Sequence, residues 1–188
     1  YHRATLNEVA DRLNITKPAL YNYFRSKEDI LFECWVMGQE RVEDRITEIE
    51  SADENGLATL RMLVRAYAAI MASDFGASLV RFNVADLSEP NQKITLAGKR
   101  RIDRAFRNAI KQGIADGSIK SCDVKLTAFA ILGAVNWIGH WYKPGGELSP
   151  DQIADDFAIR LTADIAKRPD KKPSEKKATK PVRKTPSR

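Results

Sequence analysis

Cysteine, histidine and glycine-rich loops are scarce in this chain of 188 residues, which has two cysteines, two histidines and ten glycines. Cys34 and Cys122 lie far apart, so we expect neither a disulfide framework nor a paired-cysteine metal knuckle. His2 and His140 have no spacing that would pair them with a nucleophile or complete a three-ligand metal set. The Pro-Gly-Gly stretch at 144–146 is too short for a phosphate-binding loop. The sequence therefore predicts no enzyme, no metal site and no cofactor.

Long hydrophobic runs are also missing. The longest, Ala128 to Ile138, is interrupted by Asn136 and falls short of the roughly 18 residues that a membrane span requires. No signal peptide precedes the first motif, and 43% hydrophobic with 30% charged residues is typical of a soluble globular protein. We expect a soluble protein in the reducing cytoplasm.

The chain is basic, with a net charge of +6, but the excess lies at one end. Residues 167–188 hold ten Lys or Arg and two acidic residues, which leaves 21 basic and 23 acidic residues elsewhere, a net charge of −2. Four prolines and few apolar side chains predict that residues 168–188 form a disordered basic tail. Such a tail is either a solvated extension or a weak, salt-sensitive contact with DNA phosphates.

The remainder has helical periodicity and no run of alternating β-branched residues, so we predict an all-α protein. Near the start, the capping-box pair Thr5 and Glu8 introduces a helix over 6–13. Thr16 caps a second short helix over 17–24. Two short helices joined by a tight turn form a helix-turn-helix arrangement, whose second helix inserts its N-terminal end into the major groove of DNA.

The second short helix has an apolar side and a polar side. Leu20 and Phe24 are four residues apart and face inward. Lysine and tyrosine on the other side can neutralise phosphates and pack against sugars, which positions a helix on DNA. The residues left for the groove or its rims are Lys17, Pro18, Ala19, Tyr21, Asn22 and Tyr23.

The stretch LNEVADRLNITKPALYNYFRSKEDIL resembles the DNA-binding motif of TetR-family transcriptional regulators. By position, the resemblance implies phosphate contacts from Thr5, Thr16, Tyr21 and Lys27, and base-edge or groove contacts from Asn7, Lys17, Pro18, Ala19 and Tyr23. Alternatively, Tyr21 and Tyr23 cover the core of the small domain and Lys27 is an ordinary solvated lysine.

Family members carry a complete helix before this motif, whereas the present sequence starts at Tyr1, where that helix should have ended. The resemblance therefore implies that the first helix is missing. Without it, Val9, Leu13, Leu20 and Phe24 lack part of their packing partner, and we expect an exposed apolar patch.

Beyond the motif the helices lengthen. We predict helices from Ser26 to about Glu50, over about 57–71, around Phe75 to Phe82, from Ser88 to the glycines of GIADGSI, over 123–142 and over 150–167, the last capped by Ser149 with Pro150 at its first position. The predicted domains are a helix-turn-helix domain over 1–33 that lacks its first helix, a helical ligand-binding and dimerisation domain over 34–167, and the tail over 168–188.

The last two helices carry a candidate dimer interface. Its stripe recurs every four residues, and small residues on the preceding helix permit close approach; the set is Ala130, Gly133, Ile153, Phe157, Leu161 and Ile165. Either this stripe is buried within one subunit, or it forms a symmetric four-helix interface between two copies. We favour the dimer, because one recognition helix reads only a few base pairs.

The stretch NWIGHWYKPGGELSPDQIADD resembles the corresponding part of TetR-like regulators of fatty-acid and sterol catabolism, several of which respond to acyl-CoA thioesters. A simple helix end and turn is the alternative interpretation. We expect an apolar ligand pocket at Tyr67, Met71, Phe106, Asn136 and Trp137. The amide of Asn136 needs a partner from a second subunit, a backbone carbonyl or the ligand.

Four cations follow one face of the long helix at spacings of four, three and four, namely Arg100, Arg104, Arg107 and Lys111. This face is either solvated or paired with acids, or it holds the phosphates of a coenzyme A moiety.

These observations predict a homodimeric, ligand-responsive, cytoplasmic and nucleoid-associated transcriptional regulator. We expect a repressor that a small apolar effector, with an acyl-CoA as the candidate, releases from a palindromic operator in double-stranded DNA. The alternative is an architectural DNA-binding protein that uses its basic tail without an effector. The sequence identifies neither the operator nor the regulated genes.

Overall fold

The computed structural model describes residues 10, 16, 18–19, 27–73, 76, 80 and 83–167. Within these residues it contains five α-helices, a short 3-10 helix and no strand: α3 (Lys27–Glu50), α4 (Gly56–Met71), η1 (Val84–Asp86), α6 (Glu89–Asp116), α7 (Val124–Trp141) and α8 (Pro150–Ala163). The prediction of an all-α protein is confirmed for the described part of the chain. The predicted short helices over 6–13, 17–24 and 75–82 lie largely outside it.

Local sequence signals set several helix ends. The side chain of Asn55 accepts a hydrogen bond from the Ala58 amide at the start of α4. Ser149 and Gln152 form a complete capping box at the start of α8, where Pro150 occupies the first turn as expected. Gly117, with φ of 79°, ends α6 in the left-handed region that favours glycine.

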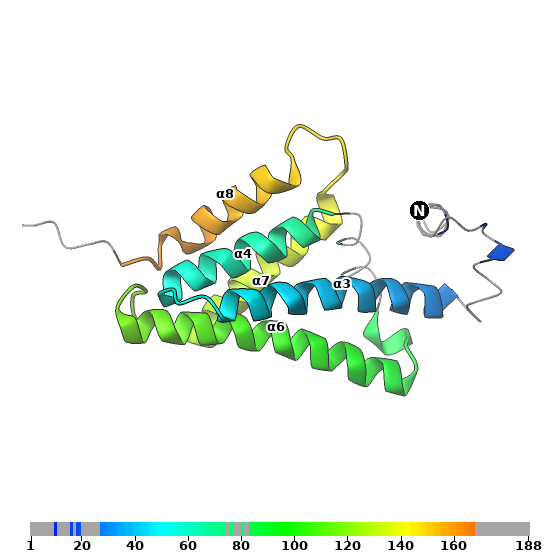
Figure 1. The fold of residues 1–188 in the computed structure, drawn as a ribbon, viewed down its shortest axis with the longest axis horizontal. Coiled ribbons are helices and arrows are strands. Elements are labelled where there is room, and N and C mark those ends of the chain that lie inside the picture. Colours follow the sequence, from blue (N-terminus) through cyan, green and yellow to red (C-terminus); the bar gives the residue numbers. More distant parts are fainter. Residues whose placement is uncertain are drawn as a thin grey trace, which may run out of the picture.

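Helix α4 lies at the centre and packs against α3, α6, α7 and α8 (Figure 1). Its residues at spacings of three and four are fully buried, including Leu60, Val64, Ala68 and Met71. Helices α3 and α6 lie side by side along the molecule, and α8 covers α4 from the opposite side. The hydrophobic core is thus formed by helices that pack around α4.

Two glycine positions mark where helices approach too closely for a side chain. A Cβ atom added at Gly56 would lie 2.0 Å from the amide nitrogen of Gly113, so α4 and α6 touch there through their backbones. A Cβ atom at Gly98 would lie 2.7 Å from Cδ of Gln39 and 2.8 Å from Cη2 of Trp35. Gly98 therefore sets the separation between α6 and α3.

The end of α8 differs from the prediction. The apolar period predicted a helix to residue 167, but α8 ends at Ala163, and Ala166 forms an antiparallel β-bridge with Ile119. The amide of Lys120 donates to the Ile165 carbonyl at 2.8 Å, and that of Lys167 donates to the Ser118 carbonyl at 2.9 Å. Bonding to the α6–α7 turn replaces the last helical turn.

The stripe predicted for dimerisation is oriented mainly inward. Ile153 is buried, and Phe157, Leu161 and Ile165 are partly buried against the core, where α8 packs on α4. Ile153 is thus used within one chain, because α4 packs against this side of α8, whereas a contribution of the partly buried residues to a subunit interface stays a prediction. Ala130 and Gly133 of α7, by contrast, are exposed.

Candidate functional site: a cavity between four helices

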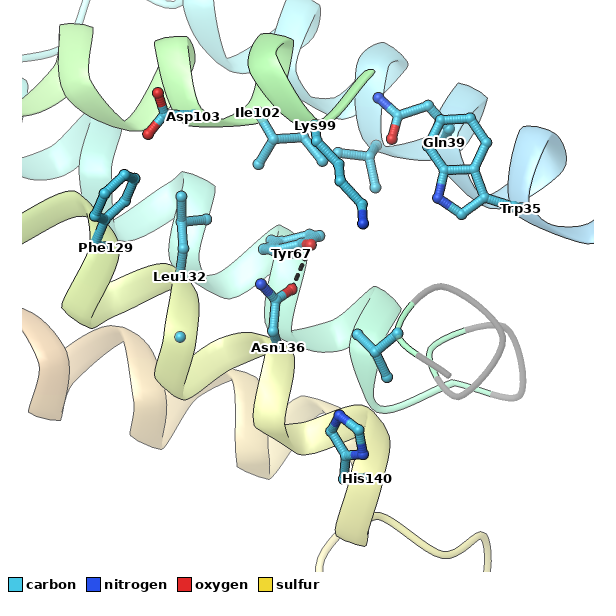
Figure 2. A pocket seen from close by; sticks show the side chains of 13 residues that line it. Trp35, Gln39, Tyr67, Lys99, Ile102, Asp103, Phe129, Leu132, Asn136 and His140 are labelled. Atoms are coloured by element: carbon cyan, nitrogen blue, oxygen red, sulfur yellow. Dashed lines mark hydrogen bonds between the residues drawn. The ribbon is translucent and has the colours of Figure 1, made fainter. Parts of the chain in front are cut away.

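A cavity of about 520 Å³ lies between α3, α4, α6 and α7 (Figure 2). Its walls are largely apolar, but six polar or charged residues line it from the four helices. The lining residues are Trp35, Gln39, Val42, Tyr67, Val80, Lys99, Ile102, Asp103, Phe129, Leu132, Gly133, Asn136 and His140. An apolar cavity of this size with a few polar groups is typical of a small-molecule site.

The first polar feature joins two of the predicted pocket residues. The Tyr67 hydroxyl donates a hydrogen bond of 2.7 Å to Oδ1 of Asn136, linking α4 to α7. The Tyr67 ring is buried and meets Phe106 edge-on, with ring centroids 6.1 Å apart. Burial raises the pKa of Tyr67, so the hydroxyl stays protonated and remains a donor. This partner for Asn136 was not among those expected from the sequence.

The second polar feature is Lys99, which the sequence analysis did not single out. Its side chain extends from α6 towards Tyr67 (Figure 2). Part of its length is exposed, yet desolvation lowers the pKa of the ammonium group. No described residue forms an ion pair with it. Lys99 lies three residues before Ile102, on the apolar face of α6, and this spacing is the feature of the sequence that could have predicted its orientation.

The third polar feature is an ion pair at one end of the cavity. Nε of Arg107 lies 2.9 Å from Oδ1 of Asp103, four residues earlier on α6. The Arg107 guanidinium also lies over the Phe129 ring, 5.2 Å from its centroid. Of the predicted basic stripe, Arg107 is thus already paired, whereas Arg100, Arg104 and Lys111 are exposed and have no ion pair with a described residue.

The other predicted pocket residues do not line this cavity. Met71 and Phe106 are fully buried in the core, and Phe106 borders a smaller cavity that it shares with Tyr67. Trp137 is 62% exposed and packs against the His140 ring, with centroids 4.7 Å apart. Its prediction as a pocket residue is corrected by its position: it follows Asn136 directly and therefore lies on a different side of α7.

An exposed apolar face covers the outer side of α7 and part of α8. We call it the outer face; it consists of Leu126, Trp137 and Trp141 of α7 and Ile159 of α8, with Ala130 and Gly133 among them. Large exposed apolar side chains such as Trp137 and Trp141 are characteristic of interaction surfaces.

Most residues predicted to contact DNA lie outside the described residues, namely Thr5, Asn7, Lys17, Tyr21 and Tyr23. Thr16 and Pro18 are exposed, and Ala19 is half-buried. The Ala19 amide donates to Oγ1 of Thr16 at 3.4 Å, as expected for a capping threonine. Lys27 is the first residue of α3.

Two negative observations concern the described residues alone. Among them, no group of three or more His, Cys, Asp or Glu side chains is arranged to hold a metal ion. None of their helices is long and apolar enough to cross a membrane.

Comparison with known proteins places the chain. Residues 1–34 match the family of bacterial regulatory proteins of the tetR family, and residues 53–164 match the tetracyclin repressor-like C-terminal domain. The HTH-type transcriptional repressor KstR2 of Rhodococcus jostii is 30% identical over 160 residues, which cover 81% of this chain and 76% of that protein.

Two solved structures are similar as well. AibR, crystallised in complex with isovaleryl coenzyme A and operator DNA, matches with a TM-score of 0.65 and 26% identity, over 82% of this chain and 84% of that one. The ketosteroid regulator KstR2 of Mycobacterium tuberculosis shares the fold, with a TM-score of 0.73 and 22% identity, over 87% and 85% of the two chains. This chain belongs to the TetR family, and it is a DNA-binding, ligand-responsive transcriptional regulator.

Proposed function

We propose that the protein is a homodimeric repressor released from its operator by an acyl-CoA thioester, and that the acyl group occupies the cavity between α3, α4, α6 and α7. The observation that carries this proposal is the combination of an apolar cavity with the Arg107 guanidinium at its edge. The AibR complex, which holds an acyl-CoA and operator DNA, supports the same ligand class.

The cavity suits an acyl chain. Its apolar walls come from Val42, Ile102, Phe129 and Leu132, and its volume lies within the roughly 300–1,000 Å³ of small-molecule sites. A chain entering it would bury apolar surface, which provides most of the binding free energy. The nucleotide part of coenzyme A is polar and bulky, so it would remain outside.

The basic stripe of α6 is placed to receive that nucleotide. Arg107 lies at the cavity edge above Phe129, and Arg100, Arg104 and Lys111 continue along an exposed face of the same helix. Guanidinium groups bind phosphates through paired charge-assisted hydrogen bonds. We propose Arg104 as the main phosphate contact, because Arg107 is already engaged by Asp103.

Helix α3 connects the cavity to the DNA-binding region. Trp35, Gln39 and Val42 of α3 line the cavity, and the family match for the DNA-binding region ends at residue 34, inside the same helix. A ligand that binds more tightly when α3 is displaced would shift the population towards a conformation with a different placement of the reading heads. The predicted domain boundary at 33/34 therefore falls within one continuous helix.

The proposed DNA contacts are those expected from the sequence: Thr5, Asn7, Thr16, Lys17, Pro18, Ala19, Tyr21, Tyr23 and Lys27. Two copies would present two recognition helices to a palindromic operator in the cytoplasm, on the nucleoid. We propose the outer face of α7 and α8 as the dimer interface, since Trp137 and Trp141 are exposed on it. The protein binds ligands and DNA and carries out no catalysis.

Calorimetry and operator-binding measurements with matched hexanoyl-CoA and hexanoate test the proposal. We expect the thioester to bind and to reduce operator affinity, and Arg104→Ala to weaken thioester binding about tenfold, as expected for one charge-assisted contact. Lys93→Ala is the matched control, because Lys93 lies on α6, pairs with Glu89 and does not line the cavity. Equal binding of the free acid would reject the coenzyme A contact, and DNA binding without operator preference would favour the architectural alternative.

A further inference from the structure

We propose that the effector places a carboxylate inside the cavity, between the ammonium group of Lys99 and the side-chain amide of Asn136. This inference rests on the proposed function and refines it: the acyl group carries a carboxylate of its own at a distance from the thioester. The cavity would thus select an acyl group with an anionic end over a plain hydrocarbon chain.

The side-chain amide of Asn136 offers hydrogen-bond donors to the proposed carboxylate. Tyr67 has a buried hydroxyl whose proton has no other acceptor among the described residues, so it goes to Oδ1 of Asn136. That bond fixes the amide with its Nδ2 group directed away from Tyr67. Both N–H groups of Nδ2 have no partner among the described residues, and Asn136 lines the cavity. The amide therefore offers donors to a ligand.

The ammonium group of Lys99 supplies the positive charge for the proposed carboxylate. An ammonium group has three donors and no acceptor, and this one extends into an apolar cavity. No described carboxylate pairs with it, although Asp103 lies one turn further along α6, because Asp103 is paired with Arg107. A partly desolvated cation without an anion is unfavourable. An anionic ligand atom at this position would remove that cost.

The remaining polar lining groups narrow the choice. Nε2 of Gln39 donates to Glu43 at 3.2 Å, so Gln39 contributes mainly its carbonyl oxygen to the cavity. That oxygen could accept one hydrogen bond from a ligand hydroxyl, whereas Lys99 and Asn136 together offer several donors. His140 lies at the other edge of the cavity, beside Trp137. The centre of the cavity is thus rich in donors and carries one positive charge, which matches a carboxylate better than a neutral hydroxyl or a methyl group.

Three six-carbon thioesters that differ only at the far end test this inference: adipoyl-CoA with a carboxylate, 6-hydroxyhexanoyl-CoA with a hydroxyl and hexanoyl-CoA with a methyl group. We expect the intact protein to bind adipoyl-CoA about tenfold to a hundredfold more tightly than hexanoyl-CoA, as is typical of hydrogen bonds to a charged group. The hydroxyl compound should fall between them. Equal affinities for all three, with operator release retained, would overturn the carboxylate and leave the proposed function standing.

Variants assign the preference to its residues. Lys99→Met keeps the length and apolar stem of the side chain but removes the charge, and it should abolish the preference for adipoyl-CoA while leaving hexanoyl-CoA affinity unchanged or higher. Lys93→Met is the matched control, as it removes an exposed lysine from the same helix that does not line the cavity. A preference that survives Lys99→Met would overturn the inference. Lys99→Arg keeps a positive charge at this position and should therefore retain the preference for adipoyl-CoA.

Free adipate and hexanoate complete the experiment, because a free acid is a second source of a carboxylate. Binding of the free acids that is lost in Lys99→Met, with no binding of thioesters, would support the carboxylate position and reject the proposed coenzyme A contact. Binding of none of the five compounds would reject both proposals for this ligand class.

Discussion

Helices α4 and α7 are both rich in apolar residues, but they bury them differently. Helix α4 packs against four neighbours and leaves no large apolar side chain highly exposed, whereas α7 exposes Leu126, Phe129, Trp137 and Trp141. Most of the apolar surface of α4 is used in folding one chain. The exposed apolar side chains of α7 have two proposed roles: Phe129 lines the ligand cavity, and the other three belong to the outer face. Apolar residues that are buried within the chain thus stabilise its fold, whereas those left exposed are available to bind a ligand or a second subunit.

The largest expected effect comes from the α4 side of this comparison. Leu60→Ala should lower the free energy of unfolding by about 2–5 kcal/mol, because it leaves a cavity in a fully packed core. Denaturant titration at several protein concentrations measures it. The effect should be independent of concentration, whereas that of Leu126→Ala should diminish on dilution. A concentration-independent loss of similar size in both variants would contradict the division between the helices.

The outer face should give the next largest effect. Trp137→Glu should weaken dimerisation by at least about 2 kcal/mol, as for an aromatic residue at the centre of an interface, while the helical content of the protomer is retained. Sedimentation and circular dichroism measure the two quantities. Lys125→Glu is the control for added charge on α7. Phe157→Glu should instead destabilise folding, since Phe157 packs against the core. A Trp137→Glu protein that stays dimeric would move the interface elsewhere.

A smaller effect should come from the hydrogen bond that joins the two helices. Tyr67→Phe leaves Oδ1 of Asn136 without its donor and should cost about 1–3 kcal/mol of unfolding free energy. The double variant Tyr67→Phe with Asn136→Leu should recover much of that loss, because both polar partners are then gone. Thermal or denaturant unfolding of the four proteins forms a double-mutant cycle. Additive losses would show that the two side chains are not coupled.

The smallest expected effect concerns the start of α4. The Asp116 carboxylate accepts a hydrogen bond of 2.7 Å from the Gly56 amide, and this bond, followed by those from Ser118, lowers the pKa of Asp116. A carboxyl group whose pKa is lower in the folded state stabilises it above the unfolded pKa of about 4, and this contribution disappears as the pH falls through the folded value. Asp116→Asn should therefore flatten the acid side of the stability profile slightly. An unchanged profile would exclude a role for this carboxylate.

Periodicity and capping signals predicted the described helices well. The starts of α6 and α8 follow from Ser88 with Pro90 and from Ser149 with Pro150, because these signals act within one turn. The orientation of α8 could not be predicted, since a stripe such as Ile153 and Phe157 is equally suited to a neighbouring helix or a second subunit. Only the three-dimensional packing shows that α4 occupies it.

The cavity was predicted less well. Asn136 was identified because a polar amide within an apolar helix needs a partner, and Tyr67 because it lies on the apolar face of its helix. Trp137 was assigned to the apolar interior, although its neighbour Asn136 already occupied the inward direction. Lys99 was overlooked because it is one of several cations on α6, and its spacing of three residues from Ile102 was the one local sign that it lies on the apolar face. Its distinctive surroundings come from α3, α4 and α7, which are distant in sequence.

The close contact at Gly98 has a genetic consequence. Because a methyl group there would collide with Trp35 and Gln39, Gly98→Ala should push α3 away from α6 at the end of the cavity. If ligand acts by displacing α3, this one methyl group would imitate the inducer, and a cell carrying the variant would express the regulated genes constitutively. Reporter expression without effector, together with circular dichroism to confirm folding, measures this. A folded Gly98→Ala protein that still represses normally would dissociate the position of α3 from induction.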